Sequence, residues 1–486
     1  MATVNAASLR DEFEAAKAGI AALRKDGKVS AQADAMFRIL ITLMSVLITI
    51  LLERATRKSD RNASLPPSQT PQDETAQRAS RSSGKGTRGN GQTSATLRKV
   101  IHEETVTVET CEACGADLSH VDPIDRERRI LYDIVFEVVE RRVEAEVKEC
   151  PACRDRTKGR FPDTMPGPLQ YGPGLKAFII TLLIAHMLSL RRATALVQAI
   201  SGLTLSEATC LSYVRHLHEA LASWEDNAIA ILLERPALHA DETGFRVDGK
   251  TRWLHVLSDG SLTLKRLHNK RGRQAIDAIG IIPRYKGILI HDCWASYFVY
   301  ETCLHQLCGS HLLRELTFVV DSNAMRWARL MTTLLRLTCH RVNQSPTKTL
   351  PEDLRRTVRR RYRTILEHGF RDLPAIPPRP KGKRGRIAKS DAHNLHERLV
   401  RHEDSVLRFM EDPHASFTNN TGEQKIRMAK VKIKVSGCFR TQLHAEAWCR
   451  ISSYLNSMAA QGYNPLVAIQ IALAGDAANM IRKHDA

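Results

Sequence analysis

Three acidic residues that are far apart in the chain lie in sequence segments typical of carboxylates that bind metal ions. Asp241 lies in the segment ALHADETGFRV, which predicts a strand ending at Asp241, and Asp292 closes the apolar run GILIHD. The segment TNNTGEQKIRMAK predicts a loop that turns into a helix, with Glu423 in its first turn and Arg427 one turn later on the same face. Carboxylates from separate segments can hold two Mg²⁺ or Mn²⁺ ions about 3.5 to 4 Å apart, an arrangement that serves in-line displacement at a phosphodiester.

Four cysteines in two CxxC pairs form a second set of candidate ligands. Cys111 and Cys114 make the first pair, and Cys150 and Cys153 make the second. Each pair offers two thiolates to one side of an ion, so the two pairs together predict a closed, structural Zn²⁺ site. We expect TVTVE and ILYDIVFEVVERRVEAEVKE to form the strands of a ribbon around it. Unpaired reduced thiols and a redox-active CxxC are the less favoured alternatives.

A third group of metal-ligand types follows Asp292. Cys303, His305, Cys308 and His311 stand close together in the sequence, in what we expect to be one helix-forming segment. A second zinc site here is less favoured than a structural role for these side chains.

The elements around Asp241 and Asp292 predict an α/β fold. ALHADETGFRV, RWLHVLSDG and LTLKRLH are expected strands, RGRQAIDAIG is an expected helix, and GILIHD is an expected buried strand. This order matches the opening of a ribonuclease-H-like sheet, in which the first and fourth strands lie side by side. Such adjacency would bring Asp241 and Asp292 together.

The rest of the chain divides by composition and periodicity. The break SGLT separates two helical patterns, with Ser206 as the expected N-cap of the second, and has the dimensions of a helix-turn-helix. Plain helical packing is the alternative. We expect seven regions: an N-terminal helical oligomerisation segment 1–53, a flexible basic linker 54–100, a zinc ribbon 101–165, a helix-turn-helix-like domain 166–235, the first part of the catalytic core 236–320, a basic helical insertion 321–415, and a C-terminal part 416–486 with Glu423 and closing helices.

The N-terminal region contains the most membrane-like stretch, from Ile39 to Leu52. This stretch is shorter than a membrane-spanning helix, which needs about 18 or more apolar residues. A heptad seam favours a self-associating or buried helix over membrane contact; it consists of Phe37, Leu40, Met44, Leu47 and Leu51. The polar, Ala-rich start does not resemble a signal peptide, and eleven Cys are too few for a disulfide scaffold, so we expect a reducing cytoplasm.

The charge balance points to a polyanion as partner. Of the 486 residues, 72 are Lys or Arg and 53 are Asp or Glu, which gives a net charge of +19, and a hydrophobic content of 43% excludes wholesale disorder. The excess lies in the linker, in the insertion (DLRRTVRRRYR and PPRPKGKRGRIAK) and after Glu423. The cations beside Glu423 would contact strand phosphates, unless they form only a solvated face; they are Arg427, Lys430, Lys432, Lys434 and Arg440.

Several ordered motifs, taken together, resemble the DDE transposases of bacterial insertion sequence family sixty-six. They are RNASLPPS, the paired CxxC motifs, LHADETGFRVDGKTRWLHVLSD, GILIHDCWASY, HQLCGSHLLREL and NNTGEQKIRMAKVKIKVSGCFRT. The resemblance implies that Asp241, Asp292 and Glu423 form the catalytic triad, and that the four CxxC cysteines hold zinc in a DNA-binding ribbon. It also places His311 and Arg314 beside the active site, in contact with DNA phosphate. The chain departs from the family pattern at Gln424, where Arg is usual.

The function expected from the acids and from the resemblance is cleavage of double-stranded DNA at element ends, followed by joining of the 3′-hydroxyls to target DNA. The expected partners are element-end and target DNA, further copies of the chain, and accessory proteins of the same element; no membrane partner is expected, and the location is the nucleoid-containing cytoplasm. Two alternatives stay open. One is a DNA-binding protein without catalysis, and the other is a metal-dependent nuclease that does not join strands.

Overall fold

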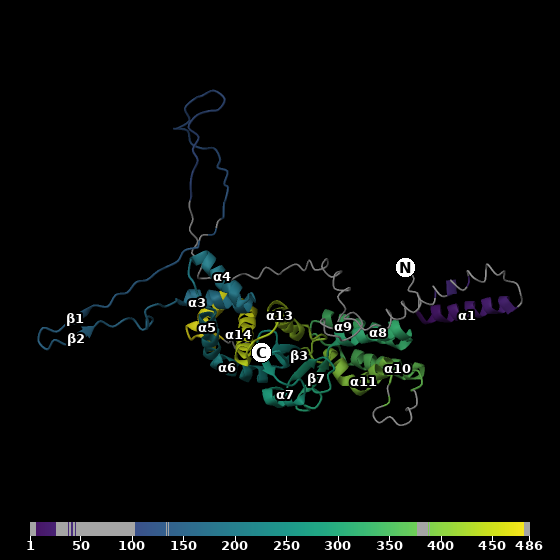
Figure 1. Cartoon of the computed structure of the whole chain (residues 1–486). Helices are drawn as coiled ribbons and strands as arrows, with labels where there is room; N and C mark the ends of the chain where they lie inside the picture. Colours follow the sequence, from purple (N-terminus) through teal and green to yellow (C-terminus); the bar gives the residue numbers. More distant parts are fainter. Residues whose placement is uncertain are drawn as a thin grey trace. The chain divides into compact units, whose positions relative to one another are not determined.

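The structure is a computed structural model that describes residues 6–25, 37, 40, 41, 44, 103–132, 134, 136–376, 387 and 389–480 (Figure 1). Helix α1 spans Ala6–Lys25, and Phe37, Leu40 and Met44 of the expected heptad seam are helical. Leu47, Leu51, the linker 54–100 and nearly all of the loop PPRPKGKRGRIAK lie outside the described residues. None of the described helices is both long and apolar enough to cross a membrane.

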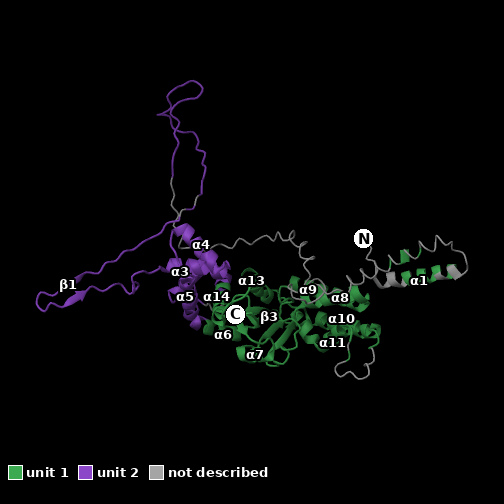
Figure 2. Ribbon diagram, viewed as in Figure 1, with its two compact units in different colours: residues 1–87, 225–456, 483–486 green, residues 88–224, 457–482 purple. Residues whose placement is uncertain are grey.

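The chain forms two compact units (Figure 2). One contains Glu225–Asn456 together with the described N-terminal residues. The other contains the described residues from 103 to Trp224 and those from Ser457 to 480.

A mixed five-stranded sheet forms the centre of the first unit, in the order β5-β4-β3-β6-β7. Its strands are β3 (Ala237–Val247), β4 (Lys250–Ser258), β5 (Thr263–His268), β6 (Ile288–His291) and β7 (Leu304–Leu307). The first three are antiparallel neighbours, whereas β6 runs parallel to both β3 and β7. Asp248 and Gly249, with φ of 50° and 66°, make the tight turn between β3 and β4. The α/β class and the predicted adjacency of the first and fourth strands are therefore confirmed.

Two local predictions are wrong. The strand does not end at Asp241: parallel pairing of β3 with β6 stops at His239, but antiparallel pairing with β4 continues to Val247. The segment from Cys303 to His311 is not one helix either. It contains strand β7, which lengthens the sheet by pairing with β6, and then the first turn of a helix that begins at Gly309.

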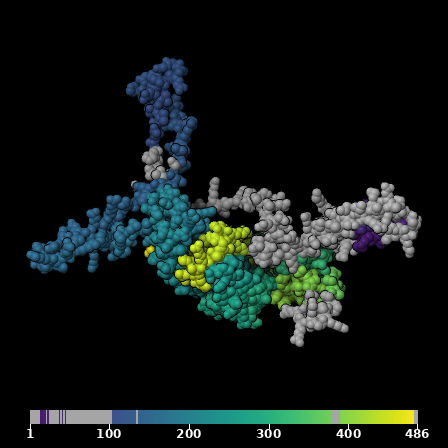
Figure 3. Space-filling view, viewed as in Figure 1, coloured from purple at the N-terminus to yellow at the C-terminus, as the bar shows by residue number. Residues whose placement is uncertain are grey.

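A helical insertion packs beside the sheet within this unit (Figures 1 and 3). Its apolar core includes Leu307 of β7 together with the buried side chains of Trp327, Tyr362 and Leu395. The Arg-rich helical character predicted for the region is confirmed. Helix α8 (Gly309–Asn323) leads into the predicted insertion 321–415, which contains α9 (Arg326–Gln344), α10 (Glu352–Asp372), α11 (Asp391–Arg401), α12 (Glu403–Leu407) and the 3₁₀ turn η6 (Arg408–Met410).

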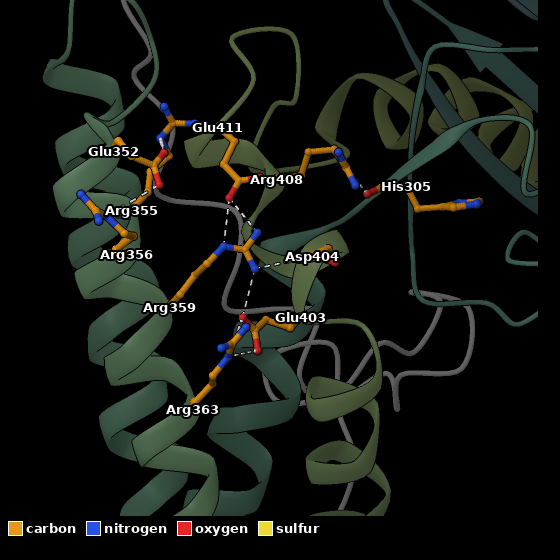
Figure 4. Close-up of polar contacts among 10 residues, drawn as sticks. All are labelled: His305, Glu352, Arg355, Arg356, Arg359, Arg363, Glu403, Asp404, Arg408 and Glu411. Carbon is orange, nitrogen blue, oxygen red and sulfur yellow. Dashed lines mark hydrogen bonds and ion pairs between the residues drawn. The ribbon is translucent and has the colours of Figure 1, made fainter.

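One arginine joins the longest of these helices to its neighbours (Figure 4). Arg359 of α10 makes ion pairs of 3.0 Å with Glu403, 2.7 Å with Asp404 and 2.7 Å with Glu411. Glu403 also pairs with Arg363 at 3.0 Å. Because Arg359 presents several donors in a planar fork, one side chain fixes α10 against α12 and the segment that follows.

The remaining helices of the unit close over the sheet. Helix α13 (Asn420–Ser436) packs against β3 and β4, and Phe439 beyond its end pairs with Arg246 and Asp248 through backbone hydrogen bonds of 3.0 and 2.8 Å. Glu423 lies in the first turn of α13, as predicted. The other elements that lie wholly or partly here are α6 (Ala222–Glu234), α7 (Arg273–Ile279), the 3₁₀ turn η5 (Ile282–Arg284) and α14 (Gln442–Ala460).

The second unit combines short helices with a small ribbon. Its helices are α3 (Pro173–Ile180), the π-helical η4 (Thr181–Ala185), α4 (Leu190–Ser201), α5 (Glu207–Ala220), α15 (Pro465–Leu473) and η7 (Ala477–Met480). Helices α4 and α5 are joined by a short turn in which Gly202 has φ of 71°. The Ser206 hydroxyl accepts a hydrogen bond of 3.0 Å from the Thr209 amide, so the predicted N-cap of α5 is confirmed.

The ribbon has much shorter strands than the sequence suggested. Strands β1 (Val147–Glu149) and β2 (Arg156–Lys158) form an antiparallel pair around the second CxxC. The described residues of TVTVE and of ILYDIVFEVV form no strand, and their side chains are exposed. The expected long ribbon strands are therefore wrong, because these alternating segments have no partner strand on which to bury one face.

Candidate active site

Asp241 sits in the middle of β3, just beyond the part of the strand that pairs with β6. The residue paired with it on β4 is Val256. The Oδ1 of Asp241 accepts a hydrogen bond of 2.9 Å from the Glu242 amide. Burial raises the pKa of the Asp241 carboxyl well above its usual value, and the charges of Glu242, Asp292 and Glu423 raise it further.

Asp292 directly follows the buried strand β6, as the sequence predicted. The Trp294 amide donates a hydrogen bond of 3.2 Å to its Oδ1. Burial raises the pKa of Asp292 to about 7, and the charge of Glu242 adds to the shift while Arg271 opposes it. A carboxyl in this state exchanges its proton near neutral pH.

Glu423 reaches the same neighbourhood from α13. Burial raises the pKa of its carboxyl, Arg314 and Arg427 lower it, and the charge of Asp292 raises it. Each pair among Asp241, Asp292 and Glu423 therefore interacts electrostatically, which puts the three acids in one neighbourhood. Within the described part of the chain, their ligand atoms do not all lie within 4.8 Å of one another, and their catalytic roles stay a prediction.

A buried acid next to Asp241 was missed by the sequence analysis. The Glu242 side chain is 1% exposed and pairs with Arg271 at 2.6 Å, while the Tyr297 hydroxyl donates to its other carboxylate oxygen. The Arg271 guanidinium lies 4.4 Å from the ring centre of Trp294 and 5.1 Å from that of Trp253. Glu242 is therefore neutralised by a fixed partner. The sequence shows two adjacent acids, Asp241 and Glu242. The alternation of a strand does not indicate which of the two is paired with a positively charged side chain.

Asn419 is a second residue that the sequence analysis missed. It is 1% exposed; its Oδ1 accepts a hydrogen bond of 2.9 Å from His239 Nδ1, and its Nδ2 donates one of 2.8 Å to the Ala240 carbonyl. Its own amide donates to Cys308 Sγ at 3.2 Å, and its carbonyl accepts from the Glu423 amide at 3.1 Å. Asn419 therefore fastens the start of α13 both to β3 beside Asp241 and to the start of α8.

The predicted DNA-contacting residues fall into two groups. The Nδ1 atom of His311 lies 3.5 Å from Glu423 Oε1. The charges of Arg314, Arg427 and Lys430 lower the pKa of Glu423 against the larger rise caused by burial. Asp241 and Glu423 raise the pKa of Lys430 against the larger lowering caused by burial. The other three cations have different surroundings: Lys432 lies 5.8 Å from the Phe439 ring centre, and Lys434 and Arg440 are exposed.

The two CxxC turns have the same backbone hydrogen bonds. Cys111 N donates to Ala116 O at 2.9 Å and Gly115 N donates to Cys111 O at 2.8 Å; the equivalent bonds, from Cys150 N to Asp155 O and from Arg154 N to Cys150 O, are both 2.8 Å. The residue after the second cysteine is left-handed in each turn, with φ of 71° at Gly115 and 61° at Arg154. In each turn, backbone amides directed at the first sulfur lower its thiol pKa.

Not all of the cysteines and histidines predicted as candidate metal ligands lie close enough together to share an ion. The four CxxC cysteines are not brought within 4.8 Å of one another, whereas Cys308, His311 and Glu423 are, in the part of the chain that the structure describes. Cys303 Sγ donates to Tyr300 O, and His305 Nδ1 lies 3.0 Å from His291 Nε2. The shared zinc of the two CxxC pairs therefore stays a prediction.

Comparison with known proteins places this site in a family. A family model described as Transposase IS66 family matches residues 168–447, which is more than half of the chain and includes all three acids. A search of curated proteins finds no match. The resemblance seen in the sequence motifs is thus confirmed, and the chain belongs to the IS66 family of transposases.

Proposed function

We propose that this transposase cleaves DNA at the ends of an insertion sequence and joins the freed 3′-hydroxyls to target DNA. The observation that carries the proposal is the mutual electrostatic coupling of Asp241, Asp292 and Glu423, which come from three separate segments within the family match. The strand order β5-β4-β3-β6-β7, with three antiparallel strands followed by two parallel ones, supports a ribonuclease-H-like core beneath them.

The donor set fits divalent cations. All three acids have raised pKa values, and Arg271, whose charge lowers the pKa of Asp292, is already paired with Glu242. Oxygen donors of this kind suit Mg²⁺ or Mn²⁺, and Asp241, Asp292 and Glu423 would hold them. Two such ions, when bound, would activate the attacking oxygen and stabilise the charge on the leaving oxygen.

The residues around the acids support each step of the proposed reaction. In the first step, water attacks the phosphodiester at the element end, and the P–O bond to the 3′-oxygen breaks to free a 3′-hydroxyl. In the second, that hydroxyl attacks a target phosphodiester, so that one phosphodiester forms as another breaks. Arg427 and Lys430 would hold strand phosphates beside Glu423. The exchange needs no nucleotide energy source. The segment GFRVDGKT (Gly244–Thr251) matches the pattern GxxxxGK[ST], but it forms the antiparallel hairpin of β3 and β4 and not the strand, loop and helix of a phosphate-binding loop.

The helical insertion offers a basic surface for DNA (Figure 4). A groove of about 310 Å³ on α10 is lined by Arg356, Arg359, Arg360, Arg363, Thr364 and Glu367. Arg359 and Arg363 are held by acids of the insertion, whereas Arg356 has only a 3.8 Å contact with Glu352. Arg356 and Arg360 are exposed, so their charge is available to phosphates.

The second unit is the proposed holder of element ends. Its two matching CxxC turns support a shared structural Zn²⁺, since amides directed at cysteine sulfur favour the thiolate that zinc binds. Helices α4 and α5 would contribute as a helix-turn-helix. Pairing of chains through the N-terminal helix, and help from accessory proteins of the element, complete the proposal.

The test is metal-dependent processing of element-end DNA by the wild type and by Asp292→Asn. We expect the substitution to lower cleavage by at least about 10³-fold, since a carboxylate ligand is lost, with DNA affinity nearly unchanged. Asp372→Asn, at the exposed end of α10, is the matched control and should retain activity. Retained strand transfer in Asp292→Asn contradicts the assignment. Cleavage without joined products in the wild type supports the nuclease alternative, and binding without cleavage supports the non-catalytic one.

A further inference from the structure

A mixed group of sulfur, nitrogen and oxygen ligands lies beside the three acids. Cys308 Sγ is 4.0 Å from Glu423 Oε1, His311 Nδ1 is 3.5 Å from the same oxygen, and all three ligand atoms lie within 4.8 Å of one another. Cys308 is the N-cap of α8, His311 lies in the first turn of α8, and Glu423 lies in the first turn of α13. We propose that Cys308, His311 and Glu423 bind a Zn²⁺ ion that competes with the catalytic cations for Glu423.

The distances suit a tetrahedral zinc site. Zinc lies about 2.3 Å from sulfur and about 2.0 Å from nitrogen or carboxylate oxygen, so tetrahedral ligands are separated by about 3.5 Å for sulfur and oxygen and about 3.3 Å for nitrogen and oxygen. The separations of 4.0 and 3.5 Å exceed these by only about 0.5 and 0.2 Å. Sulfur and His311 Nδ1 also lie within 4.8 Å of each other, so zinc binding would require side-chain rotations that draw the three ligand atoms together. A fourth position stays open for water or a phosphate oxygen.

The ligand atoms are left available by their surroundings. His311 Nδ1 is buried and has no hydrogen-bond partner among the described residues, although it lies beside Glu423. An unsatisfied buried nitrogen costs free energy that a metal bond would recover. Cys308 is 1% exposed, and its sulfur already accepts the Asn419 amide at 3.2 Å.

The backbone around the sulfur offers hydrogen bonds to a metal-bound thiolate. Burial raises the pKa of the Cys308 thiol, and the amides of Asn419, His311 and Ser310, which are directed at the sulfur, oppose that shift. Hydrogen bonds to a ligand sulfur and the positive end of a helix both stabilise the thiolate and fix its direction. Thiolate and imidazole ligands prefer Zn²⁺ to Mg²⁺, so this group and the two aspartates select different ions.

The shared residue gives the site a consequence for activity. This part of the inference rests on the proposed function, because it requires Glu423 to serve the catalytic cations. Glu423 has a single carboxylate, so zinc held by Cys308 and His311 draws it away from Asp241 and Asp292. Zinc is therefore expected to inhibit Mg²⁺-dependent cleavage, and removal of the Cys308 thiol is expected to relieve that inhibition.

The first experiment counts zinc and needs no activity. Full-length wild type, Cys308→Ser, His311→Ala and the control Cys303→Ser are equilibrated with zinc, and bound metal per chain is measured by mass spectrometry. We expect Cys308→Ser and His311→Ala to bind one zinc fewer than the wild type and the control, with any zinc at the CxxC pairs common to all four. Equal zinc content in four proteins with equal circular dichroism spectra overturns the site. If a variant misfolds, the sulfur-to-cobalt absorption of the Co²⁺-loaded proteins is compared instead. Wild type and Cys303→Ser should absorb more than His311→Ala, and equal absorption of the three overturns the site.

The second experiment measures zinc inhibition of Mg²⁺-dependent cleavage of element-end DNA. Each protein is compared with its own zinc-free rate. Half-inhibition of Cys308→Ser should need at least about tenfold more zinc than half-inhibition of the wild type or of Cys303→Ser, as expected when a metal ligand is lost. Equal inhibition of all three overturns the competition for Glu423. A lack of cleavage by every protein contradicts the proposed function instead, and the zinc counts still decide whether the site exists.

Discussion

At the scale of single residues, burial of charge explains most of the site. Burial raises the pKa of Asp241, Asp292 and Glu423. The charges of Asp292 and Glu423 also raise the pKa of Asp241, and the charge of Asp292 raises that of Glu423, while Glu242 is satisfied by Arg271 and Tyr297. The group therefore has more negative charge than its fixed partners neutralise. Protons supply the missing positive charge when divalent cations are absent.

A pH dependence of stability follows for Asp292. Its pKa is about 7 in the folded chain and about 4 in the unfolded chain, so the folded state holds a proton that the unfolded state releases between these values. Without divalent cations, this residue makes the protein less stable as pH rises from about 4 to 7. We expect the stability difference between Asp292→Asn and wild type to grow in favour of the variant across this window, measured by thermal unfolding at each pH.

The difference between the two proteins is the useful quantity, because buried histidines act in the opposite sense. Burial lowers the pKa of His291 to about 3 and that of His255 to about 4, and such groups favour the folded state as pH rises. A constant difference between wild type and Asp292→Asn from pH 4 to 7 contradicts the prediction.

Asn419 offers a second test at this scale. Asn419→Ala removes the hydrogen bonds to His239 Nδ1 and to the Ala240 carbonyl, which should lower stability by about 1–3 kcal/mol. Cleavage should fall as well, because α13 then no longer fixes Glu423 beside β3. Asn420→Ala, at the next and exposed position, is the control and should match the wild type in both thermal unfolding and cleavage. Equal behaviour of the two variants removes the positioning role of Asn419.

At the scale of elements, the repeated CxxC turn makes a prediction about backbone conformation. Arg154 adopts a left-handed φ of 61° at the position that Gly115 occupies in the first turn. A side chain in this region costs about 1–2 kcal/mol, so Arg154→Gly should strengthen zinc binding about fivefold or more and Gly115→Val should weaken it. Competition with a chromophoric chelator measures both. Changes in the same direction for the two variants contradict a common turn geometry.

Elements were predictable from the sequence where burial has a simple period. The apolar run of β6, the helical patterns of α8 and α10 and the Ser206 cap all appear as expected, because each depends on neighbours along the chain. The end of β3 was misjudged, since Asp241 leaves one partner strand while the other continues. Strand β7 was taken for helix because its short sequence, LHQL, has no clear alternation.

The positions of Asp292 and Glu423 in the fold were predictable, whereas the residues that support them were not. Asp292 and Glu423 are marked by local pattern, namely the end of an apolar strand and the first turn of a helix. Asn419 and Arg271 act through contacts between distant segments, and nothing in their immediate sequence reports those contacts. The long ribbon strands failed for a related reason, since alternation predicts a strand only where a partner strand exists.

At the scale of the whole molecule, the net charge of +19 predicts DNA binding that weakens steeply with salt. Each phosphate contact that is lost reduces the slope of log affinity against log salt by about 0.9. Replacing both Arg356 and Arg360 of the α10 groove with Gln should therefore reduce the slope by about 2, measured by fluorescence anisotropy across a salt series.

A matched pair separates the groove from charge alone. Arg329 and Arg336 are exposed on α9 and do not line the groove. Their replacement with Gln removes the same charge and should leave the slope unchanged. Equal effects from the two pairs show that total charge, and not the α10 groove, determines the affinity.

The late position of Asn419 and Glu423 in the chain has a consequence for the order of synthesis. A ribosome completes the CxxC turns and both aspartates first, and at about 5–20 residues per second the third acid follows on the order of ten seconds later. Helix α15, which packs against α3 and α5 of the second unit, is synthesised later still. Under the proposed function, the unit that holds element ends is therefore completed only after the group of acids, so a nascent chain has neither complete part until its synthesis is nearly finished.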